Sequence, residues 1–221
     1  MCDEDGMETN RARRQLLRFS GASLALVAFG AHAATMRATP AQTSGPFYPL
    51  DKPLDSDADL TLIKGHKHRA SGQVVHVMGR VLDAAGKPVR GASIEIWQAN
   101  ARGRYVHPGD SNPAPLDPHF EGYASLTTDE LGRYRFKTIK PGAYPAGNAV
   151  RPPHVHFGVS AGKQRLVTQM YFPDEPRNDK DFVIAGAGEA RKSLIAEVGP
   201  PTADLEPESW LARWDVVLAS G

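Results

Sequence analysis

The sequence predicts an all-β fold: a single β-sandwich of short strands with extended loops, an N-terminal arm and little helix. The 221-residue chain contains 21 glycines and 18 prolines, which indicate many turns. Short stretches rich in valine, isoleucine and aromatic residues alternate with turn sequences, as is typical of sandwiches. Helical periodicity is confined to short segments, and no repeat of fixed period appears. We therefore expect one compact β domain after the N-terminal region.

Residues 1–33 have the three parts of a signal peptide. A basic region from Arg11 to Arg18 precedes an apolar run from Gly21 to Ala31, and small residues follow at 31–33. The apolar run is shorter than the roughly 20 residues that a membrane-spanning helix needs, so no membrane anchor is predicted. The alternative is a buried N-terminal helix. Arg13 and Arg14, followed by two leucines, resemble the twin-arginine export signal, which implies export in the folded state to the periplasm.

Composition narrows the partners and ligands of the chain. The sequence has 26 basic and 25 acidic side chains, a balance that gives no indication of a nucleic-acid partner. Its single cysteine, Cys2, lies in the predicted signal peptide. A mature chain that starts near Ala34 would therefore bind any metal ion through nitrogen and oxygen.

The predicted mature chain divides into an arm and one domain. Residues 34–71 are polar and irregular, and predict an extended arm with one dense cluster from Thr43 to Pro49. Its aromatic residues Phe47 and Tyr48 either anchor the arm to the core or contact a substrate. Residues 72–221 are predicted to form the β-sandwich.

Alternating apolar residues predict the strands of this sandwich in order. The first strand runs from Gln73 to Leu82, and a turn at 83–88 leads to the second, Ala92 to Trp97. A similar pair of strands, at 123–127 and 134–139, is joined by the turn at 129–132. The pattern also predicts strands at 155–159, 165–172 and 210–218, and a turn of helix at 179–183.

The segment Arg151-Pro-Pro-His-Val-His-Phe157 contains a candidate metal site. In an extended strand His154 and His156 project to the same face with Cα atoms about 6.6 Å apart, so one metal ion can be reached by both imidazoles. The alternative is a surface strand that carries two histidines. Tyr144 lies ten residues before His154, and Tyr105 lies in a loop after the strand that ends at Trp97. Loops at strand ends often present functional groups.

Five motifs together resemble the intradiol ring-cleavage dioxygenases, most closely the subunits of protocatechuate 3,4-dioxygenases. They lie in the expected order and are Gly-Pro-Phe-Tyr-Pro at 45–49, Ile-Trp-Gln-Ala-Asn at 96–100 with Gly-Arg-Tyr at 103–105, Lys-Pro-Gly-Ala-Tyr-Pro at 140–145, the histidine segment at 151–157, and Gln-Met-Tyr-Phe-Pro at 169–173. The resemblance implies that Tyr105, Tyr144, His154 and His156 are the ligands of a non-haem Fe(III) ion. Phenolate oxygen is a hard anionic donor that suits this ion.

The same resemblance implies the reaction and further site residues. Both atoms of O2 would enter a small catechol-type diol, and the bond between the two hydroxyl-bearing carbons would break to give a cis,cis-muconate-type dicarboxylate. Arg151 would stabilise negative charge on the substrate, Tyr144 would also take up a substrate proton, and Gln169 would lie beside the substrate or behind the ligands. A homo-oligomer is the simpler expectation, with a partner subunit as the alternative.

The sequence departs from the protocatechuate pattern between Tyr144 and Arg151. Residues 146–150, Ala-Gly-Asn-Ala-Val, stand where those enzymes carry a tryptophan and basic residues. The change puts protocatechuate in doubt as the substrate and favours a more open pocket. Two other interpretations stay open: a non-catalytic transthyretin-like binding module, suggested by residues 79–95, and a copper or zinc protein that uses His154 and His156 for another activity.

Overall fold

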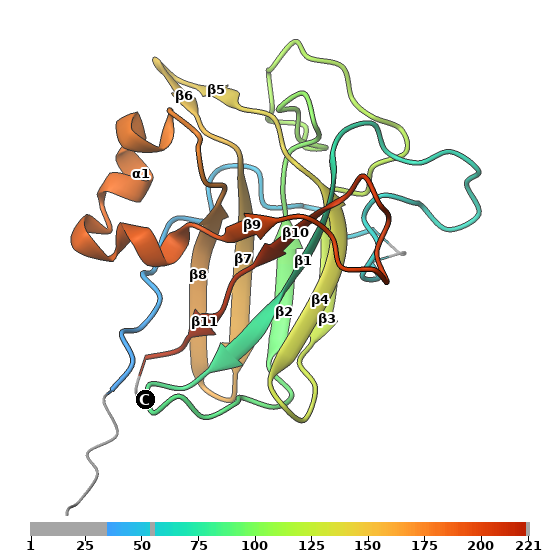
Figure 1. Ribbon diagram of the computed structural model, residues 1–221. Helices are drawn as coiled ribbons and strands as arrows, with labels where there is room; N and C mark the ends of the chain where they lie inside the picture. The colour runs from blue at the N-terminus through green and yellow to red at the C-terminus, as the bar shows by residue number, and fades with distance from the viewer. Residues whose placement is uncertain (1–34, 54–55, 220–221) are drawn as a thin grey trace, which may run out of the picture. The chain divides into compact units, whose positions relative to one another are not determined.

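The computed structural model describes residues 35–53 and 56–219, which contain two β-sheets packed against each other (Figure 1). The predicted all-β fold is confirmed. The signal peptide predicted at residues 1–33 lies outside the described residues, and the division into signal peptide, arm and domain stays a prediction. In the described part of the chain, no helix is long and apolar enough to cross a membrane.

The first sheet is organised around its longest strand, β1 (Val74–Leu82). On one side β1 pairs antiparallel with β4 (Arg133–Ile139). On the other side it pairs in parallel with β10 (Trp210–Arg213) and β11 (Val216–Val217). The short strand β9 (Glu197–Gly199) completes this sheet along β10.

The second sheet has four antiparallel strands in the order β3-β2-β7-β8. These strands are β3 (Tyr123–Thr127), β2 (Ser93–Trp97), β7 (His154–Ala161) and β8 (Gln164–Tyr171). The long β7–β8 pair brings His154 opposite Tyr171 and His156 opposite Gln169. Four residues of the resembling motifs therefore share one end of this sheet.

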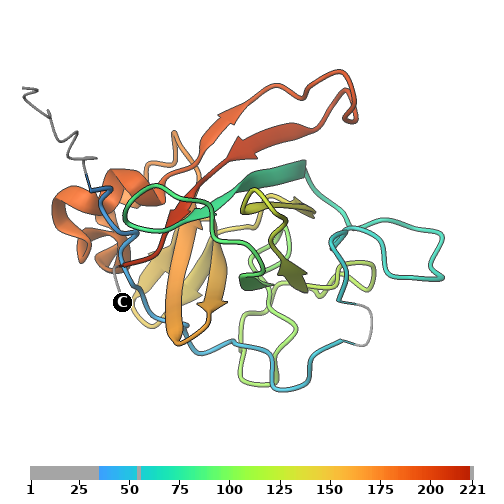
Figure 2. The ribbon, with the colours of Figure 1, turned by 90° about the horizontal axis from the view of Figure 1, so that it is seen from below.

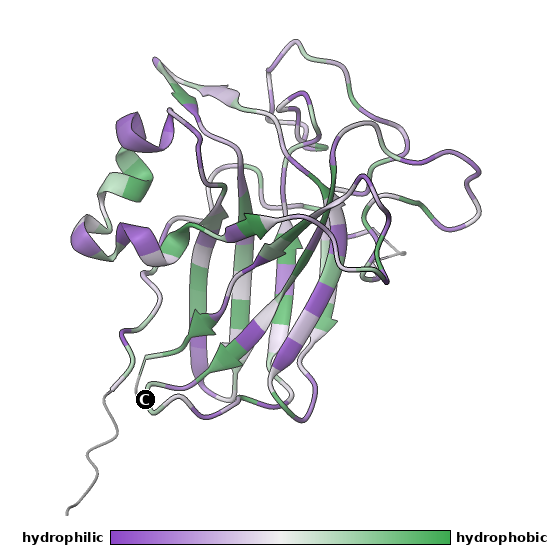
Figure 3. Cartoon of the chain, in the orientation of Figure 1, coloured by the Kyte–Doolittle hydropathy of each residue, from purple (hydrophilic) through white to green (hydrophobic). Residues whose placement is uncertain are grey.

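The hydrophobic core lies between the two sheets. Val75 and Val77 of β1 face it from one side, and Ile94, Ile96 and Phe157 face it from the other, all with exposed fractions of 1% or less. Polar residues alternate with these apolar ones along the strands, which Figure 3 shows as alternating colours. This period of two explains why most strands were predictable.

Three short strands were not predicted, and one predicted strand is divided. A two-stranded hairpin of β5 (Tyr144–Ala146) and β6 (Ala149–Arg151) occupies a stretch predicted only as a connection, and β9 was also missed. The strand predicted at 210–218 is divided into β10 and β11. At the division, the Asp215 carboxylate accepts the Arg80 backbone N–H (2.8 Å), so a side chain replaces a ladder hydrogen bond there.

Helix is scarce and lies between β8 and β9. It consists of η1 (Asn178–Lys180), α1 (Phe182–Ala185) and η2 (Gly188–Leu194). The predicted turn of helix at 179–183 coincides with the first two, whereas η2 was missed. Asp181 is the N-cap of α1 and accepts hydrogen bonds from Val183 N and Ile184 N.

The N-terminal arm runs beside the second sheet (Figure 2). Backbone hydrogen bonds join Met36 N to Ala84 O, Thr39 N to Val217 O and Gln42 N to Val167 O. The arm then continues to Phe47, which lies near Tyr105 and Tyr144. The arm therefore covers the end of the sheet that carries the two histidines.

Candidate metal centre

His154 and His156 lie next to each other at the start of β7, each with an exposed fraction of 1%. Their imidazole centroids are 4.8 Å apart and their Nε2 atoms 3.2 Å apart. The strand geometry predicted for this pair is thus what the structure shows. Trp97 of β2 stacks on His156 with a centroid distance of 4.8 Å and an interplanar angle of 7°, which fixes the plane of that ring.

Both imidazoles are neutral near neutral pH. Burial, together with the charge of Arg151, lowers the pKa of His154 to about 3. Burial likewise lowers the pKa of His156 well below its ordinary value. His154 Nδ1 lies 2.7 Å from the Pro152 carbonyl oxygen, which only accepts, so Nδ1 carries the proton. His154 Nε2 therefore presents a lone pair toward His156, as a metal-ligating imidazole does.

Tyr105 is held in place by a loop with defined hydrogen bonds. The Asn100 side chain accepts from two backbone N–H groups of the loop, and Asp110 Oδ2 accepts from Tyr105 N at 2.7 Å. Gly103 has φ +77°, and a Cβ there would lie 2.2 Å from the Ala143 carbonyl oxygen. Only glycine permits this close approach, which brings the Tyr105 loop against the chain just before Tyr144.

Tyr144 completes a cluster of two phenols and two imidazoles. Its ring centroid is 5.3 Å from that of Tyr105, and its hydroxyl is 3.5 Å from His154 Nε2. The Tyr105 and His156 ring centroids are 6.3 Å apart. The structure therefore brings together all four residues that the resemblance identified as ligands, from β5, β7 and a loop.

The two phenols are protonated in the absence of a cation. Burial raises the pKa of Tyr105 well above its ordinary value, and the adjacent Tyr144 raises it further. Burial also raises the pKa of Tyr144, although the Arg151 charge opposes this rise. A cation bound between the phenols would lower both pKa values by direct attraction of the phenolates.

The donor set fits a hard cation that also binds imidazole. The Tyr105 hydroxyl is buried and has no hydrogen-bond partner among the described residues, an arrangement that is unfavourable unless a ligand satisfies the oxygen. Among the described residues, no group of three histidine, cysteine, aspartate or glutamate side chains is placed to hold a metal ion. A metal at this cluster would depend on the two tyrosines, and nitrogen with phenolate oxygen suits Fe(III).

Arg151 and Gln169, the other two predicted site residues, belong to one buried network beside the cluster. Arg151 ends β6 with an exposed fraction of 4%. Its Nε donates to Asp181 Oδ2 (2.5 Å), and its Nη2 donates to Gln169 Oε1 (2.7 Å) and to the Tyr171 hydroxyl (3.0 Å). The Tyr171 ring lies 5.6 Å from that of His154. The network therefore adjoins the imidazole pair.

Several residues of this site were not found from the sequence. Asp181 and Tyr171 contact Arg151, and Trp97 stacks on His156. Phe47, which the sequence left open as an anchor of the arm or a substrate contact, lies 4.9 Å from Tyr105 between ring centroids. Asp181 has a local signal, because an aspartate directly before a short apolar run is typical of an N-cap. Its ion pair with Arg151 has none, since the two residues are 30 positions apart.

The cavities near this site are small. A cavity of about 210 Å³ beside the cluster is lined by Phe47, Trp97, Tyr105 and Tyr123, among others. A larger cavity of about 1110 Å³ lies elsewhere, lined by residues of β1, β4 and η2 among others, and none of the four clustered residues lines it. The chemistry of the donor groups, rather than cavity size, identifies the candidate site.

Known proteins similar to this chain are dioxygenases. A family model described as Dioxygenase matches residues 43–220. The protocatechuate 3,4-dioxygenase beta chain of Burkholderia cepacia is 47% identical over 172 residues, which cover 75% of this chain and 72% of that relative. The hydroxyquinol 1,2-dioxygenase of Rhizobium sp. is 32% identical over 213 residues, 88% of this chain and 67% of the relative.

Solved structures agree as well. The dioxygenase domain of a dioxygenase carbohydrate-binding protein fusion from Streptomyces sp. SirexAA-E superposes with a TM-score of 0.64 and 28% identity, over 84% of this chain and 100% of that domain. Fold and sequence together define a dioxygenase. The chain belongs to the intradiol ring-cleavage dioxygenase family and is an oxidoreductase that incorporates both atoms of O2. This membership favours the enzyme over the binding-module interpretation.

Proposed function

We propose that this chain is a non-haem Fe(III) enzyme that cleaves a catechol-type diol between its two hydroxyl-bearing carbons and forms a cis,cis-muconate-type dicarboxylate. The observation that carries the proposal is the buried cluster of two neutral imidazoles and two phenols, in which no described residue forms a hydrogen bond with the Tyr105 hydroxyl. Tyr105, Tyr144, His154 and His156 would hold the ion, and the two phenolates would offset part of its charge.

The bound ion would supply Lewis-acid activation of the diol. The protein groups around it have separate tasks. Neutral His154 and His156 need no deprotonation to bind a cation, because burial keeps their pKa values low. Tyr105 is covered by Phe47, so we expect it to remain shielded from water.

Tyr144 is the phenol suited to moving a proton. Burial raises the pKa of both phenols and the Arg151 charge opposes both rises, but only Tyr144 is the register partner of Arg151 across the hairpin. Its Oη would take up one of the two hydroxyl protons that the diol loses on binding. General acid–base transfer by a positioned side chain commonly contributes about 10²–10⁴-fold to rate.

Arg151 would stabilise the anionic diol. Burial alone lowers the pKa of its guanidinium, but Tyr171, Tyr144 and Asp181 raise it, so the side chain stays charged. A fixed charge in a site that excludes water stabilises a developing anion more strongly than the same charge in solution. Gln169 accepts from Arg151 and donates to Thr43 O (2.8 Å). Its role is to hold the arginine and the arm.

The substrate is proposed to be a catechol without a carboxylate. The two relatives described above are named for protocatechuate and hydroxyquinol, both aromatic ortho-diols. Between Tyr144 and Arg151, the hairpin carries no basic side chain that could pair with a substrate carboxylate. Residues 145–150 include no aromatic side chain, and Val150 is 52% exposed. These features support an uncharged diol and an open pocket.

The assembly is proposed to be a homo-oligomer, because a single chain carries all four donor groups. One relative is named as a beta chain, which supports a second subunit type as the alternative. Light scattering of the purified chain, expressed alone, would decide between them. An iron-loaded oligomer that turns over catechols supports the first, and an inactive chain that gains activity with a second subunit supports the alternative.

Export to the periplasm through the twin-arginine route is also proposed. Its support is the basic region with Arg13-Arg14 before an apolar run. Replacing both arginines with lysine should retain the protein in the cytoplasm on cell fractionation. The matched control replaces Arg11 and Arg18 with lysine, which leaves the pair intact and should leave export unchanged. Equal export of both variants would contradict the proposal.

The function is tested by anaerobic titration of the iron-loaded protein with a panel of catechols, followed by O2. We expect a coloured protein, because phenolate-to-Fe(III) charge transfer absorbs visible light. We also expect band shifts with each diol that binds, and a muconate-type product after O2 is added. A colourless protein that retains copper or zinc instead, or a product cleaved outside the two hydroxyl-bearing carbons, would overturn the proposal.

A further inference from the structure

The Asp181 carboxylate serves two structural elements at once. Oδ1 accepts from Val183 N (3.0 Å) and Ile184 N (2.9 Å), and thereby caps α1. Oδ2 accepts from Arg151 Nε (2.5 Å). The Asp181 side chain is 1% exposed and that of Arg151 is 4% exposed. The helix cap and the arginine are therefore joined by one desolvated carboxylate.

The contacts of Arg151 fix the orientation of its guanidinium plane. Nε is bound to Asp181, and Nη2 is bound to Gln169 and to the Tyr171 hydroxyl. A planar group held at two of its nitrogens cannot rotate without breaking one of these bonds. Nη1 takes part in none of these three bonds.

The partners of Arg151 differ in how firmly they are themselves fixed. Gln169 lies on β8, where it pairs with His156 of β7 in the four-stranded sheet. Asp181 precedes the four-residue helix α1, and the first residue of that helix, Phe182, is 64% exposed. The Arg151 guanidinium lies 5.7 Å from the Phe182 ring. A carboxylate bond to a buried arginine is also stronger than an amide or hydroxyl bond. The bond to Asp181 is thus the strongest that Arg151 makes, and the capping hydrogen bonds to α1 hold the Asp181 carboxylate in place.

We propose that Asp181 is a positioning residue for the ring-cleavage reaction: capped onto α1, it holds the Arg151 guanidinium in the orientation that stabilises the anionic diol. The inference rests on the proposed function, because it assumes the role given to Arg151. It goes beyond that function by assigning α1 a task in the site and by separating the helix cap from the catalytic contact.

Asp181→Asn separates the two tasks of the carboxylate. The asparagine amide oxygen still accepts from the α1 backbone, and asparagine caps helices about as well as aspartate. Its amide nitrogen is a donor and cannot accept from Arg151 Nε. The matched control is Asp179→Asn, the same change two residues earlier at a side chain that is 80% exposed.

The first readout uses protein without iron. The Arg151 Nε–H resonance, assigned by its loss in Arg151→Lys, is followed by ¹H–¹⁵N NMR. In the unmodified protein and in Asp179→Asn we expect slow exchange with solvent, because Nε–H is buried and bound to a carboxylate. In Asp181→Asn we expect a shifted resonance and faster exchange.

The second readout uses the iron-loaded enzyme. We expect kcat to fall about 10–100-fold in Asp181→Asn, as is typical when a residue that orients a site group is lost, with a smaller change in KM. The visible spectrum and iron content should stay unchanged, because the four donor groups are not altered. Asp179→Asn should match the unmodified enzyme in every readout.

Three results would overturn the inference. Unchanged Nε–H exchange with unchanged kcat would mean that Asp181 only caps α1, and loss of iron would mean that its role is structural. If Asp181→Asn does not fold, Asp181→Ser replaces it, because serine also caps helices. If neither variant folds while Asp179→Asn does, the inference is likewise overturned. An unmodified enzyme that cleaves no catechol refutes the proposed function instead, and the iron-free NMR comparison still decides whether Asp181 orients Arg151.

Discussion

Tyr144 and Arg151 are register partners across the β5–β6 hairpin. The hairpin closes through a two-residue turn, Gly147-Asn148, in which Gly147 has φ +60°. A glycine with positive φ at the first turn position is typical of a type II′ turn. This turn therefore sets the spacing between a proposed iron ligand and the charge proposed to stabilise the substrate.

Gly147→Val should disturb that spacing. A side chain in the left-handed region is expected to lower the free energy of unfolding by about 1–2 kcal/mol and to shift the hairpin, so kcat/KM should fall. The control is Gly162→Val, at φ +58° in the two-residue β7–β8 turn at the opposite end of the sheet. Neither glycine has an atom within 4 Å of an added Cβ. We expect both variants to lose similar amounts of stability in denaturant titration, and only Gly147→Val to lose kcat/KM. Equal kcat/KM in the two variants would contradict this role of the turn.

Tyr105→Phe should abolish or shift the visible band of the iron-loaded protein and weaken iron retention. Without iron the substitution should be neutral or stabilising by about 1 kcal/mol, because the buried hydroxyl that it removes has no hydrogen-bond partner in the described part of the chain. Tyr134→Phe is the control: that hydroxyl donates to the Trp214 carbonyl oxygen (2.5 Å). The control variant should lose about 1 kcal/mol of stability and keep its colour. A coloured Tyr105→Phe protein with full iron content would rule out Tyr105 as a ligand.

The sequence identifies the long strands because burial on one face imposes a period of two. The histidine pair follows from the same period, so its geometry was predictable from His154 and His156 alone. The hairpin at 144–151 escaped because its strands have three residues each, too few for a period to show. The Gly-Asn dipeptide is typical of a hairpin turn, but it predicts a hairpin only between two recognisable strands. Pro145 also argues against a strand there.

The tyrosines entered the candidate site only through family resemblance. No local pattern says that Tyr105 and Tyr144 meet, because their approach depends on Gly103 packing against the Ala143 carbonyl. The Arg151–Asp181 pair is likewise non-local. Residue types predicted the chemistry of this site, whereas its geometry required contacts between segments far apart in the chain.

Gly45→Ala should weaken iron retention through the arm. Gly45 has φ +65°, and a Cβ there would lie 3.3 Å from His156 Cε1, so either the arm or the imidazole must move by a few tenths of an ångström. Gly91→Ala is the control, because it has φ +68° and nothing within 4 Å. Both variants carry the same backbone strain, but only Gly45→Ala should release iron faster to a chelator. Equal release rates would show that the arm does not constrain His156.

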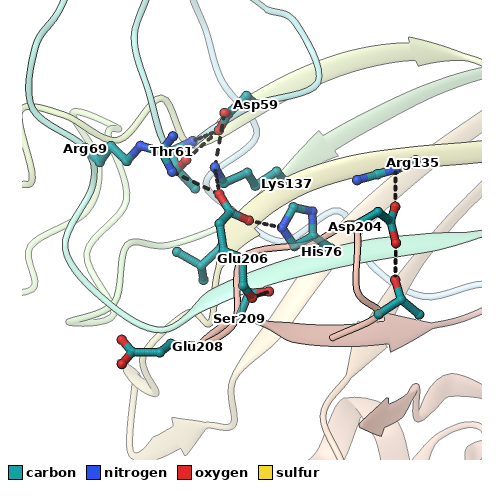
Figure 4. Close-up of polar contacts among 12 residues, drawn as sticks. Asp59, Thr61, Arg69, His76, Arg135, Lys137, Asp204, Glu206, Glu208 and Ser209 are labelled. Atoms are coloured by element: carbon teal, nitrogen blue, oxygen red, sulfur yellow. Dashed lines mark hydrogen bonds and ion pairs between the residues drawn. The ribbon is translucent and has the colours of Figure 1, made fainter. Parts of the chain in front are cut away.

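A second ionic network joins Asp59 and Arg69 of the arm, and Glu206 of the segment before β10, to the first sheet (Figure 4). The Glu206 carboxylate binds Lys137 Nζ at 2.5 Å and Arg69 Nη1 at 3.0 Å, and it also contacts His76 Nε2. Lys137 additionally lies 3.6 Å from Asp59 Oδ2. Hydrogen bonding from Lys137, then from His76 and Arg69, holds the pKa of Glu206 far below its ordinary value of 4.5.

Glu206→Gln should destabilise the protein in a pH-dependent way. Because the folded-state pKa of Glu206 lies below its unfolded-state value, its contribution is complete above about pH 4.5 and is lost as pH falls further. The effect near neutral pH should be about 1 kcal/mol or less, since the side chain is 40% exposed. The difference in unfolding free energy between the unmodified protein and Glu206→Gln, measured by denaturant titration, should therefore become smaller below pH 4.5. Glu130→Gln removes an exposed pair with Arg90 (2.8 Å) and should change little at any pH; a gap for Glu206→Gln that widens in acid would refute the linkage.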